Sequence, residues 1–345
     1  MTNKIRVVQI SESEFSVKGH GVHTAYLETI NGLKNLPGVE VSTNSFQPAD
    51  VRHIHTVGIY SLIHLLLLGG LKVVSAHVVP ASFVGSLIGA KYWLGLAKRY
   101  LVWFYNRADL VIAVSDETKM ALEELGVKSP IKVIYNMVDT SRYRQPSADL
   151  AALRKRFDIA EDSFVVIGNG QVQPRKRVDT FINLAKQFPD MQFIWVGGTP
   201  FKMLGADHNR MQQLIDGAPG NLHFSGVVSL EGVREYLSIG DVFIMTSDQE
   251  TFGLAIVEAA ASGLPIILRD LPDYDNTFRD YALMADEAGF AEALRRVAYD
   301  SKLRRELVGQ AKQLAERFDS QTISKQIVAE YDSALKAKNA TIKSK

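Results

Sequence analysis

Two glutamates eight residues apart, Glu250 and Glu258, are the side chains of this sequence best suited to hold a ligand rich in hydroxyl groups. The apolar run at 240–245 predicts a short buried strand and residues 253–262 predict a helix, so Glu250 falls in the loop between them. Glu258 lies about five residues past Gly253, and helical side chains tilt toward the N-terminus of their helix. We therefore expect the Glu258 carboxylate to approach whatever the start of this helix binds.

The start of the same helix is a predicted anion site. The free backbone N–H groups of Gly253 and Leu254 lie at the positive end of the helix dipole, where a diphosphate fits. Carboxylates accept hydrogen bonds from paired hydroxyls, so Glu250 and Glu258 could hold a sugar and a ribose on either side. The alternative is an ordinary strand, loop and helix with two incidental glutamates. The step Phe252-Gly253-Leu254 and the Ala-Ser-Gly-Leu-Pro that ends the helix favour a nucleotide-sugar site.

At these residues the chain resembles the family 4 retaining glycosyltransferases of the GT-B fold, whose signature is a glutamate, seven residues and a second glutamate. The resemblance covers nearly the whole chain. It implies an α/β architecture of two facing Rossmann-like domains with an interdomain cleft, in which Glu250 contacts the donor sugar and Glu258 the nucleotide ribose. The implied donor-binding residues are Gly21, Arg175, Lys176, Thr251, Phe252, Gly253, Leu254 and Glu258. The implied catalytic residues are His77, Lys176 and Glu250.

A second glycine loop, beginning at Gly170, is followed by three consecutive cations at 175–177. Fixed positive charge suits a diphosphate, because it stabilises the leaving group as its charge develops. Members of the resembling family carry an arginine directly after the glycine and a lysine five residues later. Lys176 matches that lysine, whereas Gln171 stands where the arginine is expected, and Arg175 is the candidate to supply the missing charge. For Arg177 a solvated helix start remains the alternative.

The first half of the chain supplies two further candidates. His77 ends the predicted strand at 72–76, at the carboxyl end where ligands of parallel sheets bind, and it matches the histidine that lies beside the donor sugar in the resembling family. Gly21 matches the second of two adjacent glycines in that family, although His20 departs from the first. We interpret His53 and His55 as structural and not catalytic.

Two clusters that resemble metal ligands are interpreted differently. Asp273-Tyr274-Asp275 is similar to the Asp-X-Asp motif of the other large glycosyltransferase fold, but it lies in a proline-flanked loop, and the GT-B resemblance implies no such metal. His53 and His55 have no third ligand at a recognisable spacing. We expect no metal and no cofactor, with a UDP-sugar as the donor substrate.

Strands and helices alternate in two successive series, the second beginning with a strand at 164–168. Such alternation favours doubly wound parallel sheets, and 345 residues fit two domains. We predict an acceptor-facing domain at 1–145 and a nucleotide-sugar domain at 146–317. Residues 318–345 are predicted to form a helix that crosses back to the first domain, followed by a basic tail.

The composition excludes several classes of protein. The net charge of +1 gives no global attraction to nucleic acid, and the absence of cysteine excludes disulfides and thiolate metal sites and suits a reducing cytoplasm. The sequence shows no secretion signal at its start, and its apolar stretch at 62–71 is shorter than the roughly 20 residues that cross a bilayer. Nothing in the sequence indicates an oligomeric state.

The segment 83–106 is predicted to be an amphipathic helix. Its aromatic face comprises Trp93, Leu96, Tyr100, Trp103 and Phe104, and its basic residues are Lys91, Lys98 and Arg99. Such a helix binds an anionic membrane surface, with its rings at headgroup depth. Packing of the aromatic stripe in the protein's own core is the alternative.

In its first half the chain resembles, more narrowly, the bacterial synthases that add a second hexose to monoglycosyl-diacylglycerol. The implied function is retaining transfer of a hexose, glucose from UDP-glucose, onto a membrane glycolipid by a protein bound to the cytoplasmic face of the cell membrane. Transfer to a soluble or polysaccharide-precursor acceptor is one alternative. A nucleotide-sugar epimerase and a non-catalytic nucleotide-sugar-binding protein are two more, and the departures at His20 and Gln171 keep the last of these open.

Overall fold

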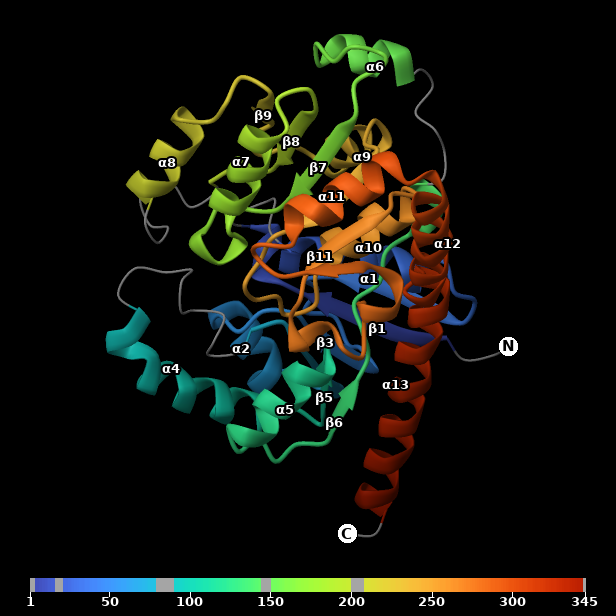
Figure 1. The fold of residues 1–345 in the computed structure, drawn as a ribbon. Helices are drawn as coiled ribbons and strands as arrows, with labels where there is room; N and C mark the ends of the chain where they lie inside the picture. Colours follow the sequence, from blue (N-terminus) through green and yellow to red (C-terminus); the bar gives the residue numbers. More distant parts are fainter. Residues whose placement is uncertain (1–3, 16–20, 79–89, 144–149, 200–207, 344–345) are drawn as a thin grey trace. The chain divides into compact units, whose positions relative to one another are not determined.

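The computed structural model describes residues 4–15, 21–78, 90–143, 150–199 and 208–343, without the side chains of 90–94, 208 and 341–343 (Figure 1). The chain divides into two compact units. Unit 1 comprises Met1–Val84, Gly89–Asp139 and Phe318–Lys345, and unit 2 comprises Gly85–Ile88 and Thr140–Arg317. The units thus divide at 139–140, whereas the domain boundary expected at 145–146 lies outside the described residues.

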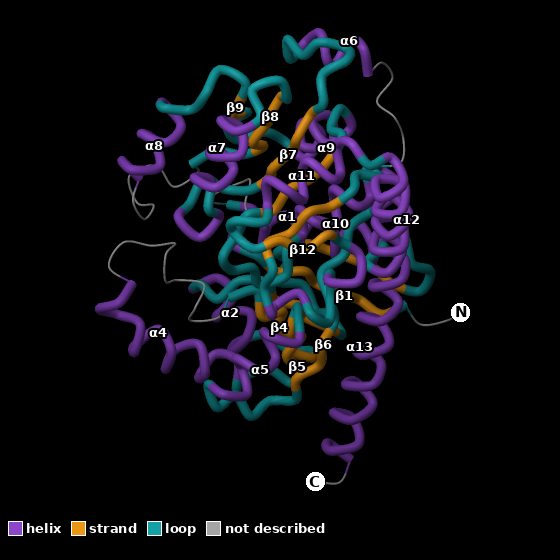
Figure 2. Tube along the Cα trace, viewed as in Figure 1, coloured by secondary structure: helices purple, strands orange, loops and turns teal. Residues whose placement is uncertain are grey.

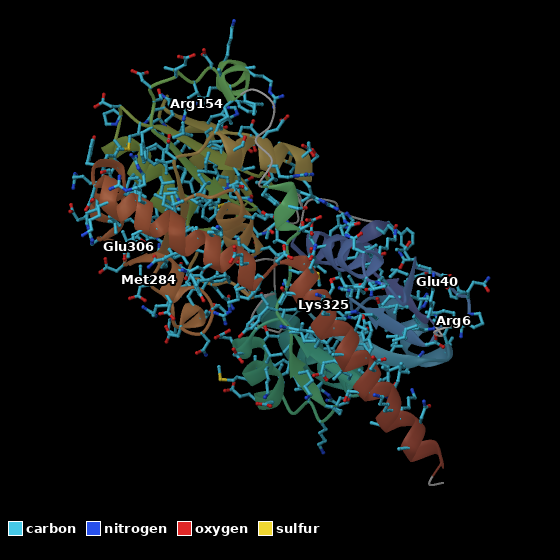
Figure 3. The ribbon with its side chains drawn as sticks, turned by 90° about the vertical axis from the view of Figure 1, so that its right-hand side faces the viewer. Arg6, Glu40, Arg154, Met284, Glu306 and Lys325 are labelled. Atoms are coloured by element: carbon cyan, nitrogen blue, oxygen red, sulfur yellow. The ribbon has the colours of Figure 1, made fainter. Side chains whose placement is uncertain are left out.

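Unit 1 is built on a six-stranded parallel sheet in the order β2-β1-β3-β4-β5-β6. Its strands are β1 (Ile5–Ile10), β2 (Val39–Thr43), β3 (Val51–Ile54), β4 (Leu71–Ala76), β5 (Leu110–Ala113) and β6 (Ile131–Val133). Arg6 of β1 and Glu40 of β2 are partners in the strand register and mark the edge of this sheet (Figure 3). Because β1 has β2 on one side and β3 on the other, the direction of winding reverses between β1 and β3. Open sheets bind ligands at the carboxyl ends of the strands beside such a switch point.

The helices of unit 1 cover both faces of its sheet, as Figure 2 shows. They are α1 (Gly21–Lys34), α2 (Ile59–Leu67), α4 (Ala90–Tyr105), α5 (Asp116–Glu124) and α13 (Ser320–Lys343). Successive strand residues point to opposite faces, so Val73 packs with α1 and α13 while Val74 packs with α2, α4 and α5. Every residue of β3, β4 and β5 is buried, and β5 is accordingly apolar throughout, whereas β3 and β4 also carry buried polar residues.

Unit 2 repeats this plan, with a six-stranded parallel sheet in the order β12-β11-β10-β7-β8-β9. Its strands are β7 (Val165–Asn169), β8 (Gln192–Val196), β9 (Leu222–Phe224), β10 (Val242–Met245), β11 (Ile266–Arg269) and β12 (Leu283–Ala285). Its helices are α6 (Leu150–Arg156), α7 (Val178–Gln187), α8 (His208–Asp216), α9 (Leu230–Ser238), α10 (Leu254–Ala261), α11 (Phe290–Tyr299) and α12 (Ser301–Arg317). The winding reverses between β7 and β10, which pair directly.

The predicted α/β fold with two doubly wound parallel sheets is confirmed. The sequence pattern did not reveal β2, β12, α11 and α12. The helix predicted at 83–106 is observed from Ala90, and residues 79–89 lie outside the described part of the chain. The last helix begins at Ser320 and continues to Lys343. In the described residues, every helix is too short or too polar to cross a bilayer.

Candidate active site

The switch point of unit 2 brings together two loops that are far apart in the sequence. The loop after β7 passes through Gly170 into a 3₁₀ turn, Pro174–Lys176, and the loop after β10 leads to α10. Hydrogen bonds tie the two loops: the Thr246 hydroxyl donates to the Lys176 carbonyl at 2.9 Å, and the Asp248 N–H donates to the Arg175 carbonyl at 2.8 Å. The predicted phosphate loop and the predicted sugar loop therefore form one surface.

Lys176 and Glu250 form a buried ion pair at the centre of this surface. The Lys176 Nζ lies 2.5 Å from Oε1 of Glu250, and the two side chains are 8% and 7% exposed. Arg175 flanks the pair, with its Nη1 3.6 Å from Oε2 of Glu250 and donating to the Gln249 carbonyl at 3.0 Å. The sequence analysis assigned Lys176 to the diphosphate and Glu250 to the sugar, and it did not anticipate that the two contact each other.

The charges of this pair depend on each other. Burial alone raises the pKa of Glu250, but the neighbouring Lys176 and Arg175 outweigh burial and hold that pKa below its ordinary value. Burial lowers the pKa of Lys176, and the carboxylates of Glu250 and Glu258 partly oppose this effect. A buried pair of this kind is sensitive to the loss of either member, because the remaining charge has no solvent to stabilise it.

Glu258 lies on α10, and its charge acts on Lys176. It is buried, and its Oε2 accepts a hydrogen bond of 3.2 Å from Nδ2 of Asn169, the last residue of β7. The helix begins after Gly253, whose φ of +89° favours glycine and where an added Cβ would lie 2.8 Å from Cδ1 of Ile256. Phe252 is buried against Phe278, so its backbone and not its ring is the part that could meet a ligand.

Gly170 and Lys176 fit each other. Gly170 has a φ of +150°, and a Cβ added there would lie 3.0 Å from Cε and 3.2 Å from Nζ of Lys176. The Gly170 carbonyl accepts a hydrogen bond of 2.9 Å from Nε1 of Trp195, which fixes the loop against β8. The glycine therefore provides the space through which the lysine reaches Glu250.

Arg177 belongs to a separate network of charges. Its guanidinium pairs with Asp179 at 3.1 Å, Asp248 at 3.3 Å and Glu287 at 3.5 Å, and Arg269 donates to Glu287 at 2.6 Å. Arg177 is therefore not the solvated helix start considered from the sequence. It fixes the turn into α7, where its own φ of +48° is unusual for a residue with a side chain.

A pocket of about 660 Å³ opens beside these loops in unit 2. Its lining residues are Gln173, Pro174, Arg175, Arg177, Val178, Asp179, Arg210, Met211, Asp248, Gln249 and Asp273. It touches the outer side of the two loops, and Lys176, Glu250 and Glu258 do not line it. We place the candidate site at those three residues and not in the pocket, because they combine buried charge with the switch point.

The Asp-X-Asp sequence divides between two environments. Asp273 lies beside Glu250, and burial raises the pKa of Asp273. Asp275 instead accepts a hydrogen bond of 2.6 Å from Nε of Arg279. Across the described ranges, no cluster of three or more histidine, aspartate and glutamate side chains could hold a metal ion.

In unit 1, His77 directly follows β4, as predicted. Its Nε2 lies 3.1 Å from Nδ1 of His55, and the two rings stack. His53 and His55 are buried and hydrogen-bonded through both ring nitrogens, which agrees with a structural role. Gly21 is the exposed first residue of α1.

Part of the aromatic face of α4 packs in the core of unit 1 and part of it is exposed. Phe104, placed on the aromatic face by the sequence analysis, is buried in the core with Leu101, so for this residue the membrane interpretation is wrong. Leu96 and Trp103 are 74% and 38% exposed, and Lys98 and Arg99 are exposed as well. The side chains of Lys91 and Trp93 lie outside the described part.

A second apolar surface lies on α2, which the sequence analysis treated only as a structural helix. Ile59, Leu66 and Leu67 are 79%, 45% and 75% exposed, and the helix carries no aspartate, glutamate, lysine or arginine. A hydrogen bond of 2.6 Å from the Tyr100 hydroxyl to the Val57 carbonyl holds α4 beside the start of α2. The absence of charge over nine residues was the signal in the sequence that could have revealed this surface.

Two family models match the chain. Residues 21–142 match the model of Glycosyltransferase Family 4, and residues 150–314 match that of Glycosyl transferases group 1. An alpha-galactosylglucosyldiacylglycerol synthase of Streptococcus pneumoniae is 31% identical over 92% of this chain and 87% of its own length. A processive diacylglycerol alpha-glucosyltransferase of Acholeplasma laidlawii is 27% identical over 78% of this chain and 80% of its own. The crystal structure of HepE from Anabaena in complex with UDP-glucose is similar in fold, with a TM-score of 0.77, 22% identity, and 95% of this chain and 100% of that chain covered.

Proposed function

Because the chain belongs to the family 4 glycosyltransferases, we propose that it transfers a hexose from a UDP-sugar to a diacylglycerol glycolipid with retention of configuration. The observation that carries this proposal is the buried contact of Lys176 with Glu250, next to Glu258, at the switch point of unit 2. Cation, carboxylates and helix start are the groups that a sugar diphosphate needs.

In the proposed donor site Lys176 is shared between protein and ligand. An ammonium has three donors, and one of them goes to Glu250, so the others serve the diphosphate oxygens. The N–H groups of Gly253 and Leu254 at the start of α10 add to this site, and Arg175 adds charge. Glu258 accepts from the ribose hydroxyls, and Glu250 accepts from the sugar.

The proposed reaction needs no nucleophile from the protein. The bond from the anomeric carbon to the diphosphate breaks as positive charge grows on the sugar, and Lys176 stabilises the departing oxygen. The acceptor hydroxyl forms the new bond from the side of the leaving group and gives its proton to the departing phosphate. Glu250 holds the sugar during this step, and His77 is the histidine that the sequence resemblance implies beside the donor sugar.

Two hexoses are candidates for the transferred sugar. Glucose is the hexose that the sequence resemblance implies and that the name of the Acholeplasma relative includes. The name of the Streptococcus relative favours galactose added to a glucosyl-diacylglycerol. Both names combine a hexose with diacylglycerol, which supports a monoglycosyl-diacylglycerol as the acceptor.

Incubation with labelled donors tests the proposal. The full chain is mixed with radiolabelled UDP-glucose or UDP-galactose and vesicles that contain monoglucosyl-diacylglycerol. We expect label in a diglycosyl lipid from one donor, with a Lys176→Ala sample as the control. Label only in a soluble product would favour a soluble acceptor, and conversion of the UDP-sugar without acceptor would favour an epimerase; either result would contradict the proposal.

We also propose that unit 1 binds the cytoplasmic face of an anionic membrane. Trp103 and Leu96 of α4 provide exposed apolar surface, the uncharged face of α2 adds to it, and Lys98 and Arg99 provide positive charge. Basic residues near an anionic surface contribute about 1 kcal/mol each. Lys91 and Trp93 complete the set that the sequence predicted.

Vesicle sedimentation tests the membrane proposal. Replacing Lys91, Lys98 and Arg99 together by alanine should weaken binding to anionic vesicles by roughly 100-fold at low salt. The control replaces Lys302, Arg305 and Lys312 on α12 of unit 2, which removes the same charge from an exposed helix. Equal losses from both triple variants would show that net charge and not this surface drives binding.

A further inference from the structure

Six side chains form a continuous hydrogen-bonded chain at the carboxyl ends of the central strands of unit 1. In order they are His77, His55, Gln9, Tyr331, His53 and Ser75. The five contacts measure 3.1, 2.7, 3.4, 2.6 and 2.7 Å. All members except His77 are buried. The chain starts at the proposed sugar-binding histidine and ends inside the unit.

The position of this chain follows from the strand register. Gln9 of β1 pairs with His53 of β3, and residues two apart on a strand share a face. His55 and His77 therefore continue the rows of His53 and Ser75 beyond the strand ends. Tyr331 enters the same row from α13, which covers this face. Apolar residues fill the row further down, so its polar members bond to one another.

The proton on His55 is fixed by its partner. Oε1 of Gln9 lies 2.7 Å from Nε2 of His55, and a carbonyl oxygen only accepts, so Nε2 carries the hydrogen. Burial, with smaller effects of His53 and His77, lowers the pKa of His55 well below its ordinary value, and the ring is neutral. Its Nδ1 is then an acceptor, and the His77 Nε2 that faces it must donate.

The other end of the hydrogen-bonded series, from Tyr331 to Ser75, keeps the Gln9 amide with its Oε1 toward His55. Nε2 of Gln9 donates to the Tyr331 hydroxyl, so we assign the proton of that hydroxyl to Nδ1 of His53, 2.6 Å away. Burial lowers the pKa of His53 to about 3, so this ring is neutral and its Nε2 donates to Ser75. With these assignments each of the five contacts has one donor and one acceptor, and all five point the same way.

We propose that these hydrogen bonds hold the neutral form of His77 as the Nε2–H tautomer, so that in this form Nδ1 is the accepting nitrogen, with His55 and Gln9 as positioning residues and α13 contributing through Tyr331. The inference rests on the proposed function, because His77 is taken to meet the donor sugar. A sugar hydroxyl then donates to Nδ1 of His77. The opposite tautomer would present a donor to the same hydroxyl.

The surroundings of His55 support its neutrality. The titratable groups packed on it are the rings of His53 and His77 and the hydroxyl of Tyr26 from α1. Tyr26 donates to Glu14 at 3.0 Å, and burial raises the pKa of Tyr26. On the α13 side, burial likewise raises the pKa of Tyr331.

Long-range ¹⁵N–¹H correlation spectra of the histidine-labelled full chain test the tautomer directly. Signals are assigned by comparison with His77→Asn and His55→Asn. We expect His77 with its proton on Nε2 at pH 8, and His55 on Nε2 without titration from pH 8 to pH 5. A His77 ring protonated on Nδ1, or a His55 that titrates near pH 6.5, would overturn the proposal.

Variants of Gln9 test whether the tautomer of His77 affects the rate of hexose transfer. Gln9→Leu removes the acceptor and should mix the two His77 tautomers and lower kcat roughly tenfold, with the donor KM unchanged. Gln9→Glu keeps an oxygen facing His55 but adds a negative charge that favours the protonated His55 ring, so Nδ1 of His55 should become a donor and the Nε2–H signal of His77 should be lost. His64→Asn is the control, since His64 is buried in unit 1 outside the chain and should leave the His77 spectrum as it is.

The outcomes separate this inference from the function that it assumes. If Gln9→Leu does not fold, Tyr331→Phe replaces it, because that variant removes one hydroxyl and keeps the ring. An Nε2–H signal in a protein that transfers no hexose would refute the proposed function alone. An active protein with His77 on Nδ1 would refute this inference alone.

Discussion

The two units use the same position in the same kind of sheet for opposite electrostatic purposes. At the switch point of unit 2, Lys176 and Glu250 are both charged and stabilise each other across 2.5 Å. At the switch point of unit 1, His53 and His55 are buried without a charged partner, and burial holds the pKa of both below the ordinary value. The site in unit 2 therefore contains charged side chains, and the site in unit 1 contains neutral ones.

This difference in charge determines what each site can bind or orient. A buried ion pair can offer part of its charge to an anionic ligand, since the donors of Lys176 are not all used by Glu250. A chain of neutral groups offers no net charge, but each link fixes the direction of the next. Unit 2 is therefore suited to grip a diphosphate, and unit 1 is suited to orient one histidine.

The largest effect is expected from breaking the ion pair. Lys176→Ala should lower the transfer rate by roughly 10² to 10³-fold, as loss of a group that stabilises developing charge does. It also leaves Glu250 buried without its nearest cation, which costs about 3–5 kcal/mol of stability. Steady-state kinetics on folded protein and chemical denaturation check the two effects. Lys186→Ala, an exposed lysine of α7, is the control, and equal kinetics for both variants would remove Lys176 from the site.

Mild acid should destabilise unit 1 more than unit 2. Native His53, with a pKa of about 3, stays neutral while the unfolded chain takes up a proton below pH 6.5, so His53 alone lowers the stability of unit 1 by about 1.4 kcal/mol per pH unit below that value. The pKa of Glu250 is lowered, so its contribution is complete above the ordinary value of 4.5 and is lost below it. Between pH 6.5 and 5, β3 should lose protection from hydrogen exchange, corrected for intrinsic rates, while β7 keeps it. Equal losses would contradict the contrast.

A smaller effect is expected at the edge of the charged site. Glu258→Gln keeps the shape of the side chain and the contact with Asn169, but weakens the acceptor offered to the ribose. We expect the donor KM to rise roughly tenfold with kcat nearly constant, the size of one hydrogen bond to a charged group. Glu306→Gln on α12 is the control, because Glu306 is exposed (Figure 3). A fall in kcat with constant KM would instead place Glu258 in the chemical step.

The sequence predicted the parts of each unit that depend on local pattern. Alternating apolar runs located most strands, and the positions of Gly170 and Gly253 marked the loops at their carboxyl ends. It could not predict the contact of Lys176 with Glu250, because 74 residues separate them and only the pairing of β7 with β10 brings their loops together.

The hydrogen-bonded histidines of unit 1 also depend on a contact that local sequence pattern cannot predict. The two-residue spacing of His53 and His55, and of Ser75 and His77, places each pair on one face of a strand. Their connection depends on Tyr331, which is 278 residues from His53 and reaches it only because α13 packs on the sheet of unit 1. The exposed face of α4 was only partly predicted for a similar reason, since helical periodicity could not tell that Phe104 faces the core while Trp103 does not.

A crystal structure of the full chain with bound UDP tests the central claim most directly. We expect the diphosphate within hydrogen-bond distance of Lys176 Nζ and of the backbone N–H groups at the start of α10, with the ribose hydroxyls on Glu258. UDP bound instead in the pocket beside Arg175 and Arg177, with the Lys176–Glu250 pair untouched, would contradict it.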